Sequence, residues 1–293
     1  MAQKVGFIGI GFMGSPMAAN LVRGGFDVIP WDTQSEALDA FAQEHGLTRP
    51  DSIADLARAS VIVTMLPTGA IVRDALTSGG ENSLAAKLAP GTVVIDMSSS
   101  EPVGTQELAA QLADRGVVLI DAPVSGGVAR AIEGTLAIMI GSDDDDAVAR
   151  VEPVLKSMGQ RLFRTGGSGS GHATKALNNL ISATNFTVAS EAMLIGRRFG
   201  LDSDTLIDVI NNSTGRSFAT EIPIKEHALT GKFGTGFALG LMAKDVQIAW
   251  QLAEALGMEA PVGKRVHTRL MEAAERIGPA ADHTRAFAAW EQD

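Results

Sequence analysis

The sequence contains no cysteine and no tyrosine among its 293 residues. Without cysteine, disulfide bonds, thiolate metal sites and cysteine nucleophiles are excluded. The apolar runs are only as long as a strand, far short of the roughly 18 residues that a membrane helix requires, so we expect no membrane partner. The first residues lack a basic stretch followed by a long apolar stretch. We therefore expect no secretory signal and a cytoplasmic location.

Basic side chains are also scarce, with 24 lysines and arginines against 34 aspartates and glutamates and a formal net charge of −10. This balance argues against nucleic-acid binding, which needs a basic surface to displace counterions. It leaves room for a local cationic pocket that binds a small acid. The five histidines have no metal-binding spacing, and the acidic run at 143–146 is typical of a solvated helix start. We therefore expect no metal site.

Segments typical of strands and of helices alternate in the first half of the chain. This alternation favours right-handed βαβ units and a doubly wound Rossmann sheet. The expected strands are at 4–9, 27–31, 60–65, 92–96, 117–121 and 136–140, and the expected helices are at 13–23, 35–42, 71–76, 102–115 and 146–158.

The pattern changes near residue 165. A turn-rich glycine and serine segment at 166–171 is followed by a long helical pattern from His172 to about residue 196. Everything downstream is typical of helices, with breaks at 211–215, 231–236 and 257–261, and no second set of strands is expected. The sequence therefore predicts an α/β domain over residues 1–165 and an all-α domain over residues 166–293, built around one long helix.

A glycine motif follows the first expected strand and begins the first expected helix. Residues 9–14 match G-x-G-x-x-G through Gly9, Gly11 and Gly14, with Phe12 and Met13 between them. The glycines allow a tight turn, a close approach of the backbone to a pyrophosphate and close packing of helix on strand. In this context the motif predicts dinucleotide binding, with a purely structural glycine turn as the alternative.

Asp32 follows the second expected strand, 18 residues after Gly14. An acidic residue at this place binds the ribose 2′-hydroxyl of NAD and repels the 2′-phosphate of NADP. No lysine or arginine occurs at 33–40. We therefore expect NAD as the cofactor, with NADP less favoured; the alternative is that Asp32 merely begins a turn.

Three further segments carry residues suited to chemistry. Ser125, Gly126 and Gly127 follow a strand and offer a hydroxyl and backbone N–H groups to a carboxylate. Lys175 and Asn179 are four residues apart, on one face of the long helix. The third segment is the dipeptide Lys244-Asp245.

With these motifs in this order, the sequence resembles the β-hydroxyacid dehydrogenase family, which contains 3-hydroxyisobutyrate dehydrogenase, tartronate semialdehyde reductase and, more distantly, 6-phosphogluconate dehydrogenase. The resemblance extends from Val5 to about Met271 and includes segments 65–67 and 96–99. It implies a Rossmann domain, a long interdomain helix, an all-α domain for substrate binding and oligomerisation, and an active site in the cleft between the domains. It also implies a homodimer or homotetramer.

The resemblance implies roles for individual residues. Lys175 is the general acid/base of hydride transfer between NAD(H) and a small β-hydroxyacid or semialdehyde, and Asn179 orients the substrate oxygen. A lysine does this near neutral pH only where burial or a neighbouring cation lowers its pKa. The implied substrate-binding residues are Ser125, Gly126, Gly127, Lys244 and Arg216; those along the cofactor are Leu66, Pro67, Ser99 and again Lys244.

One residue departs from the family pattern. Arg130 stands three residues after Gly127, where the family usually has glycine. This cation either reshapes the pocket or pairs with a more acidic substrate, or it points to solvent from a helix.

Other functions remain open at this stage. One is a catalytically silent dinucleotide-binding protein that oligomerises, and another is a semialdehyde or imine reductase of the same fold. Lys175 argues against the silent protein and against imine reduction, which uses a different residue at this place. His172, three residues before Lys175, is the one histidine with a candidate role.

Overall fold

The computed structural model describes residues 2–292. They form two compact units, the first extending to Lys175 and the second beginning at Ala176. The long helix α8 (Ser170–Phe199) begins in the first unit and continues in the second. The domain boundary between residues 165 and 166 stays a prediction.

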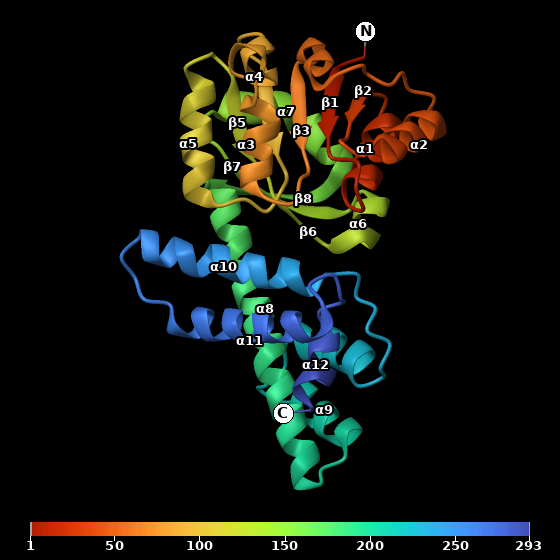
Figure 1. Ribbon diagram of the computed structural model, residues 1–293, viewed down its shortest axis with the longest axis vertical. Coiled ribbons are helices and arrows are strands. Elements are labelled where there is room, and N and C mark those ends of the chain that lie inside the picture. The colour runs from red at the N-terminus through yellow and green to blue at the C-terminus, as the bar shows by residue number, and fades with distance from the viewer. Residues whose placement is uncertain (1, 293) are drawn as a thin grey trace. The chain divides into compact units, whose positions relative to one another are not determined.

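A sheet runs through the first unit (Figure 1). Strands β1 to β5 pair with one another in parallel, and β5 pairs with β7 in the antiparallel direction. This arrangement confirms the Rossmann fold that the alternating pattern predicts. In spatial order the strands are β2 (Asp27–Trp31), β1 (Lys4–Ile8), β3 (Val61–Thr64), β4 (Val93–Asp96), β5 (Val118–Asp121), β7 (Leu136–Gly141) and β6 (Val124–Ser125), with β8 (Gly159–Gly166) also paired to β7.

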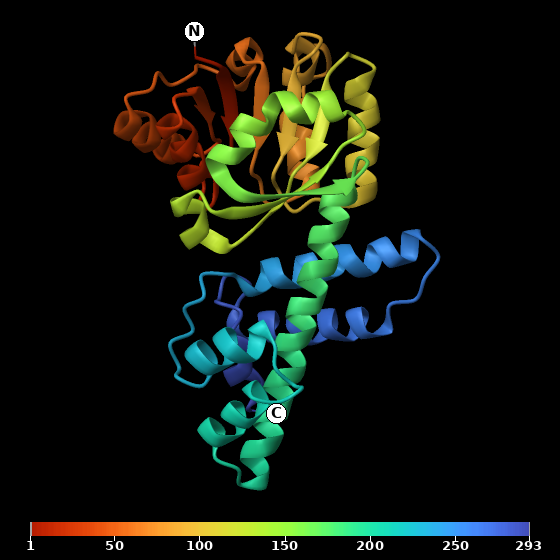
Figure 2. The ribbon, with the colours of Figure 1, turned by 180° about the vertical axis from the view of Figure 1, so that it is seen from behind.

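Helices cover both faces of this sheet (Figures 1 and 2). Alternate strand residues face opposite layers: Val61 and Val63 pack with α1 and α7, whereas Ile62 packs with α3 and α5. One layer contains α1 (Gly14–Arg23), α2 (Ser35–His45), α6 (Gly127–Glu133) and α7 (Asp145–Met158); the other contains the 3-10 turns η1 (Ile53–Arg58) and η2 (Gly80–Asn82) with α3 (Gly69–Thr77), α4 (Leu84–Lys87) and α5 (Pro102–Ala113).

Two strands were not expected from the sequence. β6 has only two residues, too few to show an alternating pattern. β8 pairs with β7 alone, and most of its side chains are exposed, Phe163 among them. An edge strand with little burial carries no apolar periodicity, which is why the sequence did not predict it.

The loops of interest leave the same edge of the sheet. Gly9, Asp32, Leu66 and Met97 follow the carboxyl ends of the parallel strands β1, β2, β3 and β4, and Ala122 follows β5. The chain passes from β1 to β2 on one side and then to β3 on the other side of β1. Ligands of such sheets bind outside the carboxyl ends of the strands at this reversal of strand order.

The second unit contains helices as its regular elements within the described residues, as expected. Phe186 and Met193 of α8 lie in its core with Leu270 and Phe287. Helices α10 and α11 lie side by side in both views (Figures 1 and 2). Besides α8, the helices are α9 (Ser203–Asn211), the π-helical segment η3 (Thr220–Ala228), α10 (Leu239–Ala255), α11 (Pro261–Ile277) and α12 (Arg285–Trp290).

Within residues 2–292, no helix combines the length and the apolar character that a membrane crossing requires.

Candidate active site

The glycine loop after β1 has the geometry that its three glycines predict. Gly9 has φ of 101°, and a Cβ on it would lie 2.3 Å from the carbonyl oxygen of Met65. A Cβ on Gly14 would lie 1.8 Å from the carbonyl oxygen of Gly9. In contrast, a Cβ on Gly11 would meet no described atom within 4 Å. The first and third glycines are therefore needed for packing, while Gly11 leaves open space beside the backbone.

Helix α1 begins at this loop with its positive end uncompensated in the described structure. Met13, which precedes the helix, makes no side-chain capping bond, and the first turn has no acidic residue. The Phe12 side chain is exposed. Backbone N–H groups at such a helix start favour an anion. Together with the open space at Gly11, these features fit the pyrophosphate of a dinucleotide.

Asp32 lies beside the glycine loop. One of its carboxylate oxygens accepts the N–H of Ile10 at 2.7 Å, and the other accepts the N–H of Gln34 at 2.8 Å. The two bonds hold the carboxylate next to the loop that would bind the pyrophosphate. This is the place that a ribose acceptor requires.

The loops after β3 and β4 are joined by a hydrogen bond. The N–H of Leu66 donates to Oγ of Ser98 at 2.9 Å, which holds the segment Leu66-Pro67 against the segment that contains Ser99. Buried Asp96 supports the second loop, since its Oδ1 accepts the N–H of Ser98 at 3.0 Å. The two segments predicted to lie along the cofactor are thus neighbours.

Ser125, Gly126 and Gly127 form the junction between β6 and α6. Gly126 has φ of 137° and Gly127 has φ of 68°, conformations that favour glycine. A Cβ on Gly126 would lie 2.6 Å from Cδ of Arg130, so the stem of Arg130 covers this glycine. The exposed Arg130 therefore lies directly beside the predicted substrate anchor.

The start of α8 is fixed to the end of β5 by Asp121. Its carboxylate accepts the N–H of Gly169 at 2.8 Å and the N–H of His172 at 2.9 Å. Burial raises the pKa of Asp121 above its ordinary value, against the opposing effects of His172 and these backbone donors. The buried His172 ring lies 2.8 Å from Oγ1 of Thr105 through Nδ1 and 3.1 Å from the carbonyl oxygen of Ser98 through Nε2.

Lys175 and Asn179 follow on α8, one helical turn apart. Within the second unit, Nδ2 of Asn179 donates to Oδ2 of Asp245 at 2.6 Å, and Nζ of Lys244 lies 2.9 Å from Oδ1 of the same carboxylate. Asp245 is buried, and its carboxylate contacts two of the predicted site residues at once. It can therefore orient both side chains.

Arg216 has a partner of its own. Its Nε lies 2.6 Å from a carboxylate oxygen of Glu221, and both side chains are exposed. This ion pair offsets part of the charge that a second anionic group of a substrate would meet. The substrate role of Arg216 stays a prediction.

Three residues that organise these groups have no role predicted from the sequence: Asp96, Asp121 and Asp245. His172 is a candidate whose role the sequence leaves open. Asp96 and Asp121 each end a buried strand, and a carboxylate at such a place is a signal that polar partners lie near it. Asp121 is distant in the sequence from its donors at the start of α8, and Asp245 is distant from Asn179, which is why spacing alone does not identify them.

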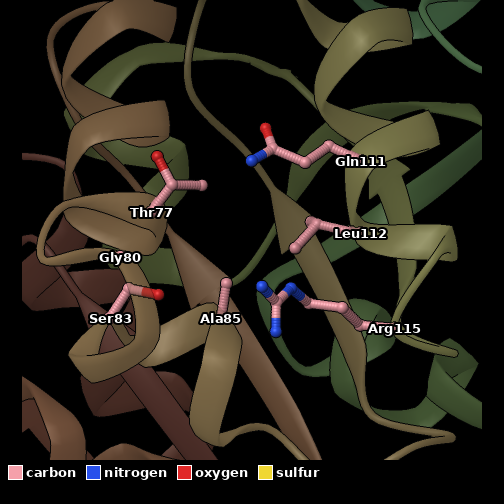
Figure 3. Close-up of a pocket in the computed structure, with 7 residues that line it drawn as sticks. All are labelled: Thr77, Gly80, Ser83, Ala85, Gln111, Leu112 and Arg115. Carbon is pink, nitrogen blue, oxygen red and sulfur yellow. The ribbon is translucent and has the colours of Figure 1, made fainter.

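A small pocket of about 80 Å³ lies elsewhere in the first unit (Figure 3). Its lining comes from α3, η2, α4 and α5 and from Ser83 and Arg115 beside them; Thr77 ends α3, which runs back from the carboxyl edge of the sheet. The pocket is well below the several hundred Å³ typical of a small-molecule site. Among the described residues, no cluster of three histidine or carboxylate side chains could hold a metal ion.

Comparison with known families identifies both parts of the chain. Residues 4–167 match the family model described as the NAD binding domain of 6-phosphogluconate dehydrogenase. Residues 169–290 match the model described as NAD-binding of NADP-dependent 3-hydroxyisobutyrate dehydrogenase.

Individual relatives agree with these models. The 2-(hydroxymethyl)glutarate dehydrogenase of Eubacterium barkeri is 33% identical over 99% of this chain and 95% of its own. The NAD-dependent L-serine dehydrogenase of Pseudomonas aeruginosa is 33% identical over 89% of each chain. The structure of 3-hydroxyisobutyrate dehydrogenase from Mycobacterium tuberculosis with L-serine has a TM-score of 0.90 and 32% identity, and covers 99% of both chains.

The glycine loop generates a paired prediction. Gly11→Ala should change the free energy of unfolding by less than about 1 kcal/mol, because its Cβ enters open space. The same Cβ should weaken NAD binding by at least about tenfold, because it fills the space that the pyrophosphate would use. Gly14→Ala should lower the free energy of unfolding by about 1–3 kcal/mol through its clash with Gly9.

Urea unfolding and isothermal titration calorimetry with NAD measure both effects. Wild-type NAD affinity in Gly11→Ala would show that the loop does not bind a pyrophosphate.

Proposed function

This chain belongs to the β-hydroxyacid dehydrogenase family, of the 3-hydroxyisobutyrate dehydrogenase type, and we propose that it transfers a hydride between NAD and a small β-hydroxyacid or the matching semialdehyde. The observation that carries this proposal is the position of Lys175. It lies on α8 one turn beyond His172, whose ring contacts the loop after β4. A dinucleotide held by the glycine loop would reach that loop with its nicotinamide.

The relatives suggest the substrate class. Their names refer to 3-hydroxyisobutyrate, 2-(hydroxymethyl)glutarate and L-serine. All three acids have the form HOCH₂–CHR–COO⁻ and differ only in R. We therefore infer a substrate of this form, with the semialdehyde OHC–CHR–COO⁻ as its oxidised partner.

The proposed chemistry divides between cofactor and protein. Bound NAD would supply the acceptor for the hydride that leaves the carbon bearing the hydroxyl group. Lys175 takes the hydroxyl proton during oxidation and returns it to the carbonyl oxygen during reduction. Asn179, oriented by Asp245, is proposed to hold the substrate oxygen.

The substrate carboxylate is assigned to Ser125, Gly126 and Gly127, whose backbone conformation suits an anion. Lys244 and Arg216 remain further candidates for the same or a second anionic group. Arg130 is a third candidate, because its stem covers Gly126 and its exposed head is next to this anchor. A second carboxylate on R would suit such a cation.

Lys175→Ala tests the mechanism. It should lower kcat by roughly 10²–10⁴-fold, because proton transfer loses its acid and base. NAD affinity should stay within about threefold of wild type, because the glycine loop is unchanged. Lys156→Ala, which removes an exposed lysine of α7, is the matched control. Steady-state kinetics and calorimetry provide the two numbers, and a fully active Lys175→Ala enzyme would contradict the mechanism.

A substrate screen separates this function from its alternatives. 3-Hydroxyisobutyrate, glycerate, 3-hydroxypropionate, L-serine, threonate and sulfonated analogues are offered with NAD or NADP while nicotinamide absorbance is followed. Turnover of at least one acid supports the dehydrogenase. Tight NAD binding with no turnover of any acid would favour a silent dinucleotide-binding protein.

Asp32 makes a prediction about the cofactor. We infer that its carboxylate gives the enzyme a preference for NAD over NADP. Asp32→Asn should shift the ratio of kcat/KM values towards NADP by at least about tenfold, because the charge that repels the 2′-phosphate is gone. Asp27→Asn is the control, since it removes an equal charge at the other end of β2. A wild-type enzyme that prefers NADP tenfold would overturn the role of Asp32.

The oligomeric state is a further proposal. Exposed apolar side chains recur on α8 at intervals of four or seven residues, which places them on one helix face: Leu177, Ile181, Val188, Ile195 and Phe199. We propose that a second copy of the chain covers this face in a homodimer or homotetramer. Ile195→Glu with Phe199→Glu should shift the sedimentation coefficient towards that of a monomer. A wild-type monomer would contradict the proposal.

The cytoplasmic location expected from the sequence stays a prediction.

A further inference from the structure

His172 is a buried side chain to which the proposed reaction gives no role. It is the third residue of α8, and only 1% of it is exposed. The backbone around it is closely held, since the N–H groups of Gly169 and His172 donate to Asp121. A Cβ on Gly171 would lie 2.4 Å from the carbonyl oxygen of Met139. The helix therefore starts in close contact with β7 and the end of β5.

Both ring nitrogens have partners on other elements. Nε2 lies 3.1 Å from the carbonyl oxygen of Ser98, which can only accept, so Nε2 carries a proton and donates. Nδ1 lies 2.8 Å from Oγ1 of Thr105 on α5. The two contacts fix the plane and the direction of the ring.

Ser98 extends this connection to a third segment. Its Oγ accepts the N–H of Leu66 at 2.9 Å. Hydrogen bonds therefore join the loop after β3, the loop after β4 and the first turn of α8. These two loops are the segments predicted to lie along the cofactor, and α8 is the helix that bears Lys175.

Two carboxylates lie near the ring but have donors of their own. Asp96 lies 3.6 Å and Asp121 lies 3.9 Å from the nearest ring nitrogen. Thr64, Ser98 and Ser100 donate to Asp96, and backbone N–H groups donate to Asp121. A neutral amide at position 172 would therefore leave both carboxylates hydrogen bonded.

We propose that His172 is a positioning residue for hydride transfer, which sets the place of Lys175 relative to the loops after β3 and β4 through its bond to Ser98. Lys175 lies three residues further along the helix, a rise of about 4.5 Å and nearly one turn, so the two side chains share one side of α8. A shift of the first turn moves Lys175 by the same amount. This inference rests on the proposed role of Lys175 as acid and base.

The test compares two amides at position 172. Gln places its amide where Nε2 lies and can still donate to the carbonyl of Ser98; Asn is one methylene shorter and reaches only the place of Nδ1. His172→Asn should therefore lower kcat by roughly 10–100-fold with NAD and 3-hydroxyisobutyrate, because a misplacement of about 1 Å has effects of this size. His172→Gln should keep kcat within about threefold of wild type.

Two further readouts separate positioning from general damage. NAD affinity, measured by calorimetry, should stay within about threefold of wild type in both variants, because the polar contacts of the ring are with Thr105, Ser98, Asp96 and Asp121 rather than with the glycine loop. With 3-hydroxyisobutyrate deuterated at C3, the isotope effect on kcat should be larger in His172→Asn than in wild type, because hydride transfer becomes more rate-limiting. Equal loss of kcat in the two variants, or no loss in His172→Asn, would overturn the proposal.

Thr105→Val provides a second variant on another element, for use if His172→Asn does not fold. It removes the partner of Nδ1 and should lower kcat several-fold at constant NAD affinity; an unchanged kcat would count against positioning.

Lys175→Ala separates the two proposals. If that variant keeps its turnover, the proposed function fails. If it loses turnover while His172→Asn keeps its kcat, only the role of His172 fails.

Discussion

The arrangement of the candidate site depends on one buried carboxylate, that of Asp121 at the end of β5. A charge in apolar surroundings is unfavourable unless donors surround it. Here the donors are backbone N–H groups at the start of α8. The carboxylate therefore fixes the start of the long helix, and the N–H groups at that start provide the hydrogen bonds that the buried carboxylate needs. At this point the chain changes from alternating strands and helices to helices alone.

The sequence could predict the helices and strands whose buried side chains form a regular apolar pattern within a short stretch of chain. Val61, Ile62 and Val63 alternate between the two layers, and similar short apolar runs mark the other central strands. The glycine loop was also predictable, because Gly9 has a positive φ, Gly14 packs against the backbone of Gly9, and Gly11 leaves space beside the backbone. The order of the motifs along the whole chain indicated the family, and the comparisons confirm that resemblance.

The contacts that orient the candidate site residues depend on partners that are distant in the sequence. Asp121 and Gly169 are 48 residues apart, and Ser98 and His172 are 74 residues apart, so no window of local periodicity contains both members of either pair. The same holds for Asn179 and Asp245, 66 residues apart. Sequence patterns could identify Lys175 and Asn179 as candidates, whereas the groups that orient them come together only when the strands are in register and α10 packs with α8.

The two bonds that Asp32 accepts have a consequence for how such a protein can diverge. The carboxylate is at once a discriminator of cofactors and a structural acceptor for the N–H groups of Ile10 and Gln34. A lineage that exchanges it for a cationic side chain loses both acceptors in the same step. A change of cofactor preference at this position therefore requires other acceptors for the backbone of the glycine loop. A single substitution of Asp32 changes the cofactor selectivity and weakens the order of the loop at the same time.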